Sequence, residues 1–458
     1  NTLSGGESQR INITKSIGSS LVGSMYILDE PSIGLHSKDT YKLINILKKL
    51  RDIGNTVIIV EHDEEIIKQA DEIIDIGAGA GIYGGNIVFQ GNISTKKIDK
   101  NSLTLQYIYK KKKIPIPEKR KKLEKKITIT SINKHNIKNI NIKIPLGGLL
   151  LITGVSGSGK STLVKEIIKP AIQNYLNNDL QIGKTYKKIN IEDKNIKKIE
   201  FINQNPLGKS SRSNPVTYTK IYDDIRKVFH KQDLSKIRNY KPGIFSFNID
   251  GGRCENCKGD GKIKIEMQFM ADVYIKCKDC KGNRFKEEVL DIKFGDKNIS
   301  EVLNLSIKDS IEFFKKNNQE NISEKLKLLD DVGLGYLALG QSSSTLSGGE
   351  SQRVKLASFL LKSNENEKTI FIFDEPTTGL HFHDIHKLLA AFYKLIKQGN
   401  SIICIEHNLD IIKCADWIID LGPGGGEEGG NIIFQGTPEE IIKHNKSITG
   451  KYLKEKID

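Results

Sequence analysis

Hydrophobic positions in this chain fall into short apolar runs, and polar residues capable of chemistry follow directly after them. Leu149–Thr153 is one such run, and Met25–Leu28 and Ile370–Phe373 are each followed by the dipeptide Asp-Glu. Short apolar runs of this kind are typical of strands buried on both faces of a parallel sheet. Isoleucine alternates with polar residues over Ile140–Ile144, which predicts a further strand. The pattern therefore indicates an α/β fold.

The apolar runs belong to a set of motifs that occurs twice in the chain. Thr2–Arg10 recurs letter for letter at Thr345–Arg353, an offset of 343 residues. Three further motifs recur in the same order at an offset of 345 residues: Asp29-Glu30-Pro31 and Asp374-Glu375-Pro376, Glu61-His62 and Glu406-His407, and Gly84–Gly91 and Gly429–Gly436. Because chance does not preserve order and spacing in this way, we interpret the chain as two copies of one cassette, the first without its front half.

A glycine-rich stretch between the two sets fits the phosphate-binding pattern G-x-x-x-x-G-K-[ST]. Glycines allow backbone N–H groups to approach a phosphate, Lys160 adds a positive charge, and the Ser161 hydroxyl can bind Mg²⁺. A strand precedes the stretch and a helix is predicted after it, which disfavours a chance glycine turn. The nucleotide contacts we expect here are Gly154, Ser156, Gly157, Ser158, Gly159, Lys160, Ser161 and Thr162.

Taken in order, these motifs resemble the ATP-binding cassette (ABC) ATPases. In that family Leu-Ser-Gly-Gly-Glu is the signature, the strand ending in Asp-Glu is Walker B, and a histidine after a later strand is the switch histidine. The carboxylates at these strand ends suit Mg²⁺ and a general base. The resemblance implies these roles: Asp29 and Asp374 for Mg²⁺, Glu30 and Glu375 as general bases, His62 and His407 at the γ-phosphate, Gln204 as the Mg²⁺-sensing glutamine, and Ser4, Gly5, Gly6, Ser347, Gly348 and Gly349 as signature contacts to nucleotide.

Four of the six cysteines form two close pairs, Cys254/Cys257 and Cys277/Cys280, with nineteen residues between the pairs. The spacing C-x₂-C-x₁₉-C-x₂-C predicts a tetrahedral structural Zn²⁺ site, and disulfides are the alternative. The strict alternation over Lys262–Phe269 predicts a β-ribbon between the pairs. Its apolar side chains have two interpretations, a small core or wedges against a disturbed base step: Met267, Phe269, Met270 and Tyr274.

The charge balance points to a polyanionic partner. The formal net charge is +15, and hydrophobic residues make up 37% of the chain with no run long enough to span a membrane. The loop residues Lys209, Arg212 and Asn214 suit DNA phosphates, with a solvated loop as the alternative. Residues 101–126, with Lys110–Lys113, predict an extended basic linker that is either a solvated tether or a phosphate contact.

Together, the tandem signatures, the phosphate loop and the cysteine insertion make the whole chain resemble the C-terminal half of the UvrA family. This family comprises the damage-recognition ATPases of the bacterial UvrABC excision nuclease. The resemblance implies ATP, Mg²⁺ and Zn²⁺ as cofactors, damaged double-stranded DNA, a UvrB-like helicase subunit and a second copy of the chain as partners, and a cytoplasmic location without membrane. Because residue 1 is Asn and not Met, we expect the C-terminal part of a longer protein.

The expected organisation follows from the motifs. The predicted parts are the back of a first cassette (1–100), a basic linker (101–126), the Walker A part of a second cassette (127–205), a signature-domain insertion (206–344) with a zinc module (254–280), and the signature and Walker B part of the second cassette (345–458). We expect Lys160, Asp374, Glu375 and His407 to face Ser4 and Gly6, while the other site lacks a phosphate loop. The isolated chain is then expected to bind ATP at one site and to hydrolyse it poorly.

Other functions remain open on the sequence alone. A membrane-transporter cassette would lack the four-cysteine insertion. A chromosome-maintenance ATPase would carry long coiled coils between its halves, and none is evident in the sequence. A DNA-binding module without catalysis is the third alternative, and ATPase activity with and without DNA separates it from the damage-recognition ATPase.

Overall fold

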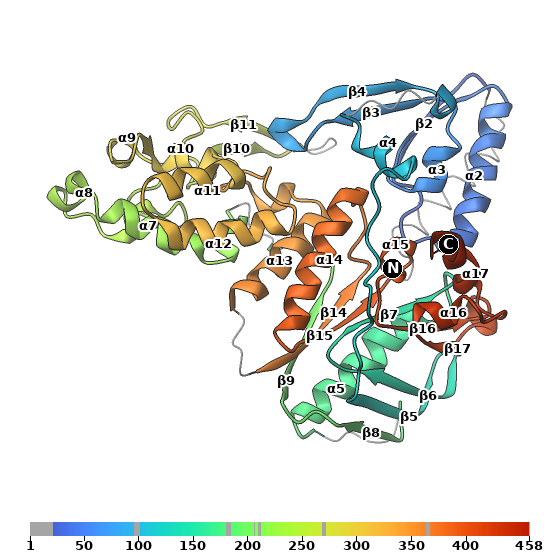
Figure 1. The fold of residues 1–458 in the computed structure, drawn as a ribbon. Helices are drawn as coiled ribbons and strands as arrows, with labels where there is room; N and C mark the ends of the chain where they lie inside the picture. Colours follow the sequence, from blue (N-terminus) through green and yellow to red (C-terminus); the bar gives the residue numbers. More distant parts are fainter. Residues whose placement is uncertain are drawn as a thin grey trace. The chain divides into compact units, whose positions relative to one another are not determined.

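The computed structural model describes residues 22–95, 101–179, 185–205, 207–208, 212–267, 272–362 and 367–457. The chain divides into two compact units, and Figure 1 shows their elements. Unit 1 comprises residues 1–203 and 364–458, and unit 2 comprises residues 204–363. The first signature, with Ser4, Gly5 and Gly6, lies outside the described residues, as do Lys209, Phe269 and Met270.

The second cassette supplies the central six-stranded sheet of unit 1, in the order β17-β16-β7-β15-β14-β9. Strand β7 pairs in parallel with β15 and β16, β14 pairs in parallel with β15 and β9, and β17 is antiparallel at the edge. Every residue of β7 is buried, as its apolar run predicts. The strands are β7 (Leu149–Gly154), β9 (Ile196–Ile202), β14 (Lys368–Asp374), β15 (Ser401–Ile405), β16 (Trp417–Gly422) and β17 (Asn431–Gly436).

A three-stranded antiparallel sheet, in the order β6-β5-β8, packs with the central sheet in one hydrophobic core. The alternating isoleucines predicted as a strand lie in β6, with their side chains buried. A helix of π type, η3 (Thr162–Ile168), follows the phosphate loop and continues into α5 (Lys169–Leu176). The remaining elements here are β5 (Lys126–Lys134), β6 (Ile137–Pro145), β8 (Lys188–Ile191), α14 (Phe382–Lys397), α15 (Leu409–Ile412), η6 (Gly426–Glu428), α16 (Pro438–Ile441) and α17 (Ile448–Ile457).

The first cassette contributes a smaller part of unit 1. One face of its β1-β2 sheet is exposed to solvent. Met25 and Ile27 are 63% and 68% exposed, whereas their repeat counterparts Ile370 and Ile372 are both 0% exposed. The opposite face of the two strands packs on α2. The elements are β1 (Met25–Asp29), α2 (Ser37–Asp52), β2 (Thr56–Val60), α3 (Glu64–Lys68), β3 (Ile73–Gly77), η1 (Gly81–Tyr83), β4 (Asn86–Gly91), η2 (Ile93–Thr95) and α4 (Leu103–Ile108).

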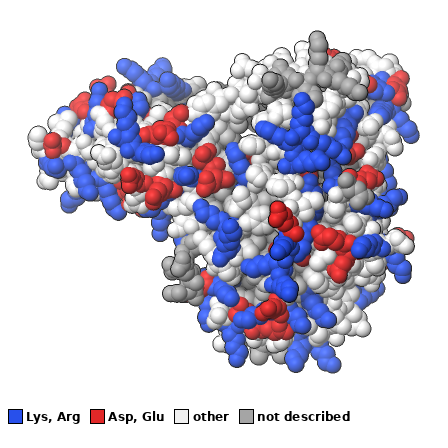
Figure 2. Space-filling model, in the orientation of Figure 1, with Lys and Arg blue, Asp and Glu red and all other residues white. Residues whose placement is uncertain are grey.

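The extended linker predicted for residues 101–126 is wrong at its start, where α4 forms. Ser102 caps this helix by accepting from the Leu105 N–H, and Leu105 and Ile108 are buried. The cap and the two apolar side chains at i and i+3 outweigh the proline and charge signals that begin later. Figure 2 shows a dense group of cationic side chains over the segment that follows α4, where Lys110–Lys113 are exposed.

Unit 2 is mostly helical and is built around a cluster of phenylalanine rings. Phe229, Phe245, Phe294 and Phe314 are in ring contact within it. The second signature begins α13, which packs against α12. The elements are α6 (Pro215–Tyr218), α7 (Ile221–His230), α8 (Asp233–Ile237), η4 (Pro242–Phe245), β10 (Lys262–Ile265), β11 (Val273–Lys276), α9 (Glu287–Leu290), β12 (Lys293–Phe294), β13 (Lys297–Asn298), α10 (Ile299–Asn304), α11 (Ile307–Lys316), α12 (Glu320–Asp331), η5 (Ser343–Thr345) and α13 (Gly348–Lys362).

Candidate functional site

The phosphate loop leaves the end of β7 and turns sharply into η3. Gly154, Gly157 and Gly159 have φ of +132°, +75° and +101°, a region that favours glycine. A Cβ on Gly154 would lie 2.2 Å from the Leu421 carbonyl oxygen, so no other residue fits there. The predicted loop residues Gly154–Thr162 thus form a tight backbone turn at the carboxyl end of a parallel strand, where α/β sheets bind ligands.

The loop's polar side chains are poised for an anion. The Lys160 ammonium donates to the carbonyl oxygens of Gly154 (2.9 Å) and Val155 (2.8 Å), and burial lowers its pKa to about 8. Among the described residues, the buried hydroxyls of Ser156 and Ser158 have no hydrogen-bond partner. Buried polar atoms without partners are costly, and phosphate oxygens would satisfy them. The loop therefore fits the phosphates of a nucleotide, with Ser161 exposed at the start of the helix where a Mg²⁺ ligand is expected.

The predicted acidic pair of the second cassette lies at the end of β14. Asp374 forms an ion pair with Lys165 at 2.7 Å, and Glu375 Oε1 lies 3.7 Å from His407 Nε2. Burial raises the pKa of Glu375 to about 7, and the neighbouring carboxylates of Glu406 and Asp374 add to the shift. Burial also lowers the pKa of His407 well below its usual range. A carboxyl group tuned near neutrality is suited to general-base chemistry.

The first cassette repeats this geometry. Asp29 ends β1, and Glu30 Oε1 lies 3.6 Å from His62 Nε2. Glu30 and Glu375 both adopt positive φ, +43° and +47°. A left-handed backbone at a non-glycine residue carries strain and is concentrated at functional sites. Burial raises the pKa of Glu30 as well.

Two acidic residues that the sequence analysis did not select organise these loops. Glu406 accepts hydrogen bonds from the backbone N–H groups of Thr377, His407 and Asn408. Glu61 accepts in the same way from Ser32, His62 and Asp63. Each carboxylate ties the loop after Walker B to the histidine loop of its own cassette. The repeated Glu-His dipeptide is the sequence feature by which these two glutamates could have been identified.

A cavity of about 230 Å³ within unit 1 is lined by both cassettes. Glu30 and His62 contribute to it from the first, and Glu375 and His407 from the second. The structure therefore brings together the glutamate of each Asp-Glu pair and the histidine of its cassette, although the two cassettes' residues are more than 300 positions apart in sequence.

The second signature and Gln204 lie in unit 2. Ser347 and Glu350 form a reciprocal cap, in which the Ser347 N–H donates to Glu350 Oε2 (2.7 Å) and the Glu350 N–H donates to Ser347 Oγ (3.2 Å). A Cβ on Gly348 would lie 3.1 Å from the Gln204 Cβ, so this glycine allows the predicted Mg²⁺-sensing residue to pack against the signature helix. The backbone N–H groups of Ser347, Gly348 and Gly349 belong to the N-terminal end of α13, which favours negative charge.

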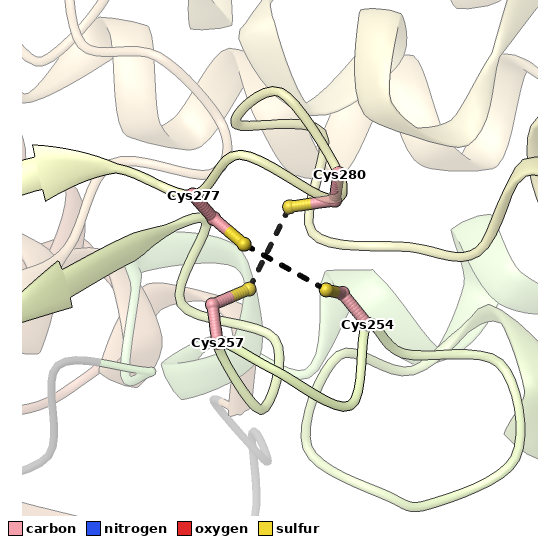
Figure 3. A group of neighbouring side chains, drawn as sticks. All are labelled: Cys254, Cys257, Cys277 and Cys280. Atoms are coloured by element: carbon pink, nitrogen blue, oxygen red, sulfur yellow. Dashed lines mark hydrogen bonds between the residues drawn. The ribbon is translucent and has the colours of Figure 1, made fainter.

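The four paired cysteines converge in unit 2 with their sulfur atoms pointing toward one another (Figure 3). The Sγ–Sγ distances are 3.9 Å for Cys254 and Cys277 and 3.6 Å for Cys257 and Cys280, and all four Sγ atoms lie within 4.8 Å of one another. A tetrahedron with Zn–S bonds of about 2.3 Å has edges of about 3.8 Å. The buried thiol set therefore fits a Zn²⁺ ion, and none of the four is in a disulfide.

The predicted ribbon between the cysteine pairs forms from β10 and β11, which are antiparallel. Of the four residues interpreted as a small core or as wedges against a base step, Met267 and Tyr274 are described. Met267 and Tyr274 are 37% and 60% exposed, and Ile263 alone of the ribbon packs against the cysteines. The exposure of Met267 and Tyr274 disfavours a small core at these two positions, and the wedge interpretation stays a prediction.

The predicted DNA contact through Asn214 is wrong. Its side chain is 1% exposed and caps α6 by accepting from the Thr217 N–H, so it is not available to a partner. Arg212 is half-buried and its guanidinium reaches the Lys258 carbonyl at 3.5 Å. Asparagine before proline is a helix-cap signal, and the surrounding cations obscured it in the sequence.

A family profile described as "ABC transporter" matches residues 137–378, from β6 to the loop after Walker B. The match spans more than half of the chain and includes the phosphate loop, the second signature and the Asp374-Glu375 pair. The chain belongs to this ABC family. No helix among the described residues of this ABC protein is long and apolar enough to cross a membrane.

Individual relatives are similar over nearly the whole of this ABC chain. UvrABC system protein A of Clostridium tetani is 54% identical over 454 residues, which cover 99% of this chain and 48% of the relative. The protein of the same name from Aquifex aeolicus is 52% identical, covering 99% of this chain and 49% of the relative. A crystal structure of UvrA2 from Deinococcus radiodurans superposes with a TM-score of 0.92 at 38% identity, covering 100% of this chain and 55% of that one. The chain spans about half the length of these relatives.

Proposed function

We propose that this chain is the C-terminal part of a UvrA-like ATPase, which recognises damaged DNA in nucleotide excision repair. The similarity to UvrABC system protein A over 99% of the chain carries the proposal. These relatives are named as protein A of the UvrABC system. The cytoplasm is the expected location, and damaged double-stranded DNA, a UvrB-like helicase and a second copy of the chain are the expected partners.

The nucleotide chemistry is assigned to the second cassette. Lys160 and the backbone of the phosphate loop bind the phosphates of ATP, and Asp374 and Ser161 would hold Mg²⁺. When bound, this ion would supply positive charge beside the phosphates. Glu375 accepts the proton of the attacking water, and His407 lies beside it at 3.7 Å. The signature residues Ser4 and Gly6 are the expected contacts on the opposite side of this nucleotide.

The second candidate function is a zinc- and DNA-binding fragment with weak catalysis. The exposed face of β1 favours it, because the equivalent face of the second cassette is packed in one core with the three-stranded sheet and with the helix that follows the phosphate loop. We therefore expect the first cassette to need a phosphate-loop segment from another part of the protein. The 458-residue chain then binds one ATP and turns it over slowly.

Measurement of ATP binding and hydrolysis by the 458-residue chain, with and without a lesion-bearing duplex, tests the proposal. Lys160→Ala is expected to weaken Mg·ATP binding by removing the charge on the phosphates, and to abolish hydrolysis. Lys138→Ala is the control, since this lysine is exposed on β6 and lies outside the phosphate loop. Full turnover by Lys160→Ala would show that the assigned site does not carry the activity. DNA binding without any nucleotide binding would favour the second candidate.

A further inference from the structure

A hydrogen-bonded relay joins the loop after Glu30 in the first cassette to the phosphate-loop strand of the second. His36 Nε2 lies 3.1 Å from Thr449 Oγ1, and Thr449 Oγ1 donates to Asp420 Oδ1 at 2.7 Å. The same Oδ1 accepts from Thr153 Oγ1 at 2.8 Å. Thr153 directly precedes Gly154, the first residue of the phosphate loop. The relay thus ends at the base of the nucleotide site.

The direction of the hydrogen bonds is determined by the histidine tautomer. His36 Nδ1 accepts from the Lys38 backbone N–H at 3.2 Å, so the proton of the neutral ring is on Nε2. Nε2 then donates to Thr449, and the Thr449 hydroxyl proton is left for Asp420. Burial lowers the pKa of His36 to about 4, which keeps the ring neutral at physiological pH.

An equivalent relay runs in the opposite direction, from a histidine of the second cassette to an aspartate of the first. His381 Nε2 lies 3.1 Å from Thr104 Oγ1, Thr104 donates to Asp75 Oδ1 at 3.0 Å, and His381 Nδ1 accepts from the His383 N–H. The two sets are related residue by residue at the 345-residue offset of the cassettes: His36 and His381, Asp75 and Asp420, Thr104 and Thr449. A serine two residues before each threonine binds the other carboxylate oxygen.

The two relays differ in one respect that bears on nucleotide binding. Asp420 also accepts a hydrogen bond from Thr153, which adjoins the phosphate loop of the second cassette. The G-x-x-x-x-G-K-[ST] pattern occurs only once in this sequence, so the relay at Asp75 has no corresponding phosphate loop in this sequence. Asp420 is 2% exposed, and a buried carboxylate depends on its hydrogen-bond donors. Loss of one hydroxyl is therefore expected to shift the Asp420 carboxylate and, with it, Thr153 at the end of β7.

We propose that His36 is a positioning residue for the nucleotide site at Lys160: through Thr449 and Asp420 it holds the end of β7, so that the phosphate loop of the second cassette depends on the loop that follows Glu30 in the first. The His36 ring also packs edge to face with the His407 ring, with centroids 6.3 Å apart. Among the described residues, the hydrogen bonds of the His36 ring go to Thr449 and Lys38, so its proposed effect on the phosphate loop runs through the relay. This inference rests on the proposed ATP site.

The test compares three variants of the 458-residue chain. Thr449→Val keeps the shape and removes the hydroxyl, Thr449→Ser keeps the hydroxyl, and Thr104→Val makes the matched change in the relay without a phosphate loop. We expect Thr449→Val to weaken binding of Mg²⁺ with a slowly hydrolysed ATP analogue by about tenfold, the scale of one hydrogen bond to a charged group. Thr449→Ser and Thr104→Val are expected to bind as the parent does.

Hydrogen exchange in the absence of nucleotide gives a second readout. Thr449→Val is expected to raise exchange of the amides of residues 154–162, and Thr104→Val is not. Should Thr449→Val not fold, His36→Phe leaves the hydroxyls around Asp420 in place and carries the same expectation. Equal behaviour of Thr449→Val and Thr104→Val in both readouts overturns the relay. If the parent chain binds no nucleotide, the proposed ATP site is wrong, and hydrogen exchange alone decides the relay.

Discussion

Gly34 in the first cassette lies against Glu375 in the second. A Cβ on Gly34 would lie 3.3 Å from Glu375 Oε2, and a Cβ on Gly379 would lie 3.2 Å from Glu30 Oε1 in the reciprocal contact. Both glycines have positive φ, +68° and +67°. The loop after each Walker B motif therefore limits the position of the general-base candidate of the opposite cassette.

We expect Gly34→Ala to lower ATP hydrolysis by about tenfold or more, because it displaces a group whose role as general base depends on hydrogen-bond geometry. Nucleotide affinity should change little, since the phosphates contact the loop at Lys160. Steady-state kcat and the dissociation constant of Mg·ATP measure the two effects. Gly379→Ala introduces the same backbone strain next to Glu30 and is the control. Equal losses in both variants would point to a general effect of strain.

The pH dependence of hydrolysis should report the ionisation of Glu375. Burial raises the pKa of this carboxyl group to about 7, so it is protonated below that pH and cannot accept a proton from water. We expect kcat/KM to rise with pH up to about 7 and to fall about tenfold per pH unit well below it. Glu375→Gln should abolish the activity that follows this profile while ATP still binds. A profile without inflection between pH 5 and pH 8 would contradict the role of Glu375.

Removal of the metal should destabilise unit 2 more than unit 1. We expect one Zn²⁺ per chain by elemental analysis, because the four thiols supply a closed tetrahedral set. Cys277→Ala or a chelator should lower the thermal transition that reports unit 2, since structural zinc contributes directly to folding. Cys404→Ala, a buried cysteine of β15 in unit 1, is the control and should retain zinc. A chain without zinc that melts as the parent does would exclude a structural metal.

The bare face of β1 permits a matched pair of substitutions. Ile27→Asp is expected to leave the stability of the chain nearly unchanged, because Ile27 is 68% exposed. Ile372→Asp is at the repeat-equivalent position and is 0% exposed, so a buried unpaired charge should prevent unit 1 from folding. Chemical denaturation measures both effects. In the longer protein that we propose, Ile27→Asp should become destabilising. Tolerance there would mean that nothing covers this face.

DNA binding should weaken steeply with salt if electrostatic attraction to phosphates dominates it. We expect the slope of log affinity against log salt to become shallower when Lys110–Lys113 are replaced by alanine, by up to about 0.9 for each DNA phosphate that these lysines neutralise. Lys315→Ala/Lys316→Ala removes exposed charges at the end of α11 and is the control. Fluorescence anisotropy over a salt series gives the slopes. An unchanged slope would support the interpretation of these lysines as a solvated segment.

Local sequence patterns predicted many features of this protein because their physical causes are local. The apolar run before Gly154 becomes β7, the repeated Asp-Glu pairs lie at the ends of β1 and β14, and the spaced cysteines converge. In each case the residues themselves impose the geometry: β-strand burial, glycine φ angles or thiolate coordination. The same reasoning was wrong for Asn214 and for the start of residues 101–126, where a helix cap outweighed charge and proline signals.

The way the two cassettes touch could be known only from the tertiary structure. The sequence contains His36, Asp420 and Thr449 as unremarkable polar residues, and their repeat at a constant offset does not say which copies touch. Packing of the two halves in unit 1 places His36 on Thr449 and Gly34 on Glu375, so that each loop serves the opposite cassette. Hydrogen bonds between residues 413 positions apart depend on how whole sheets pack, and no local propensity encodes that arrangement.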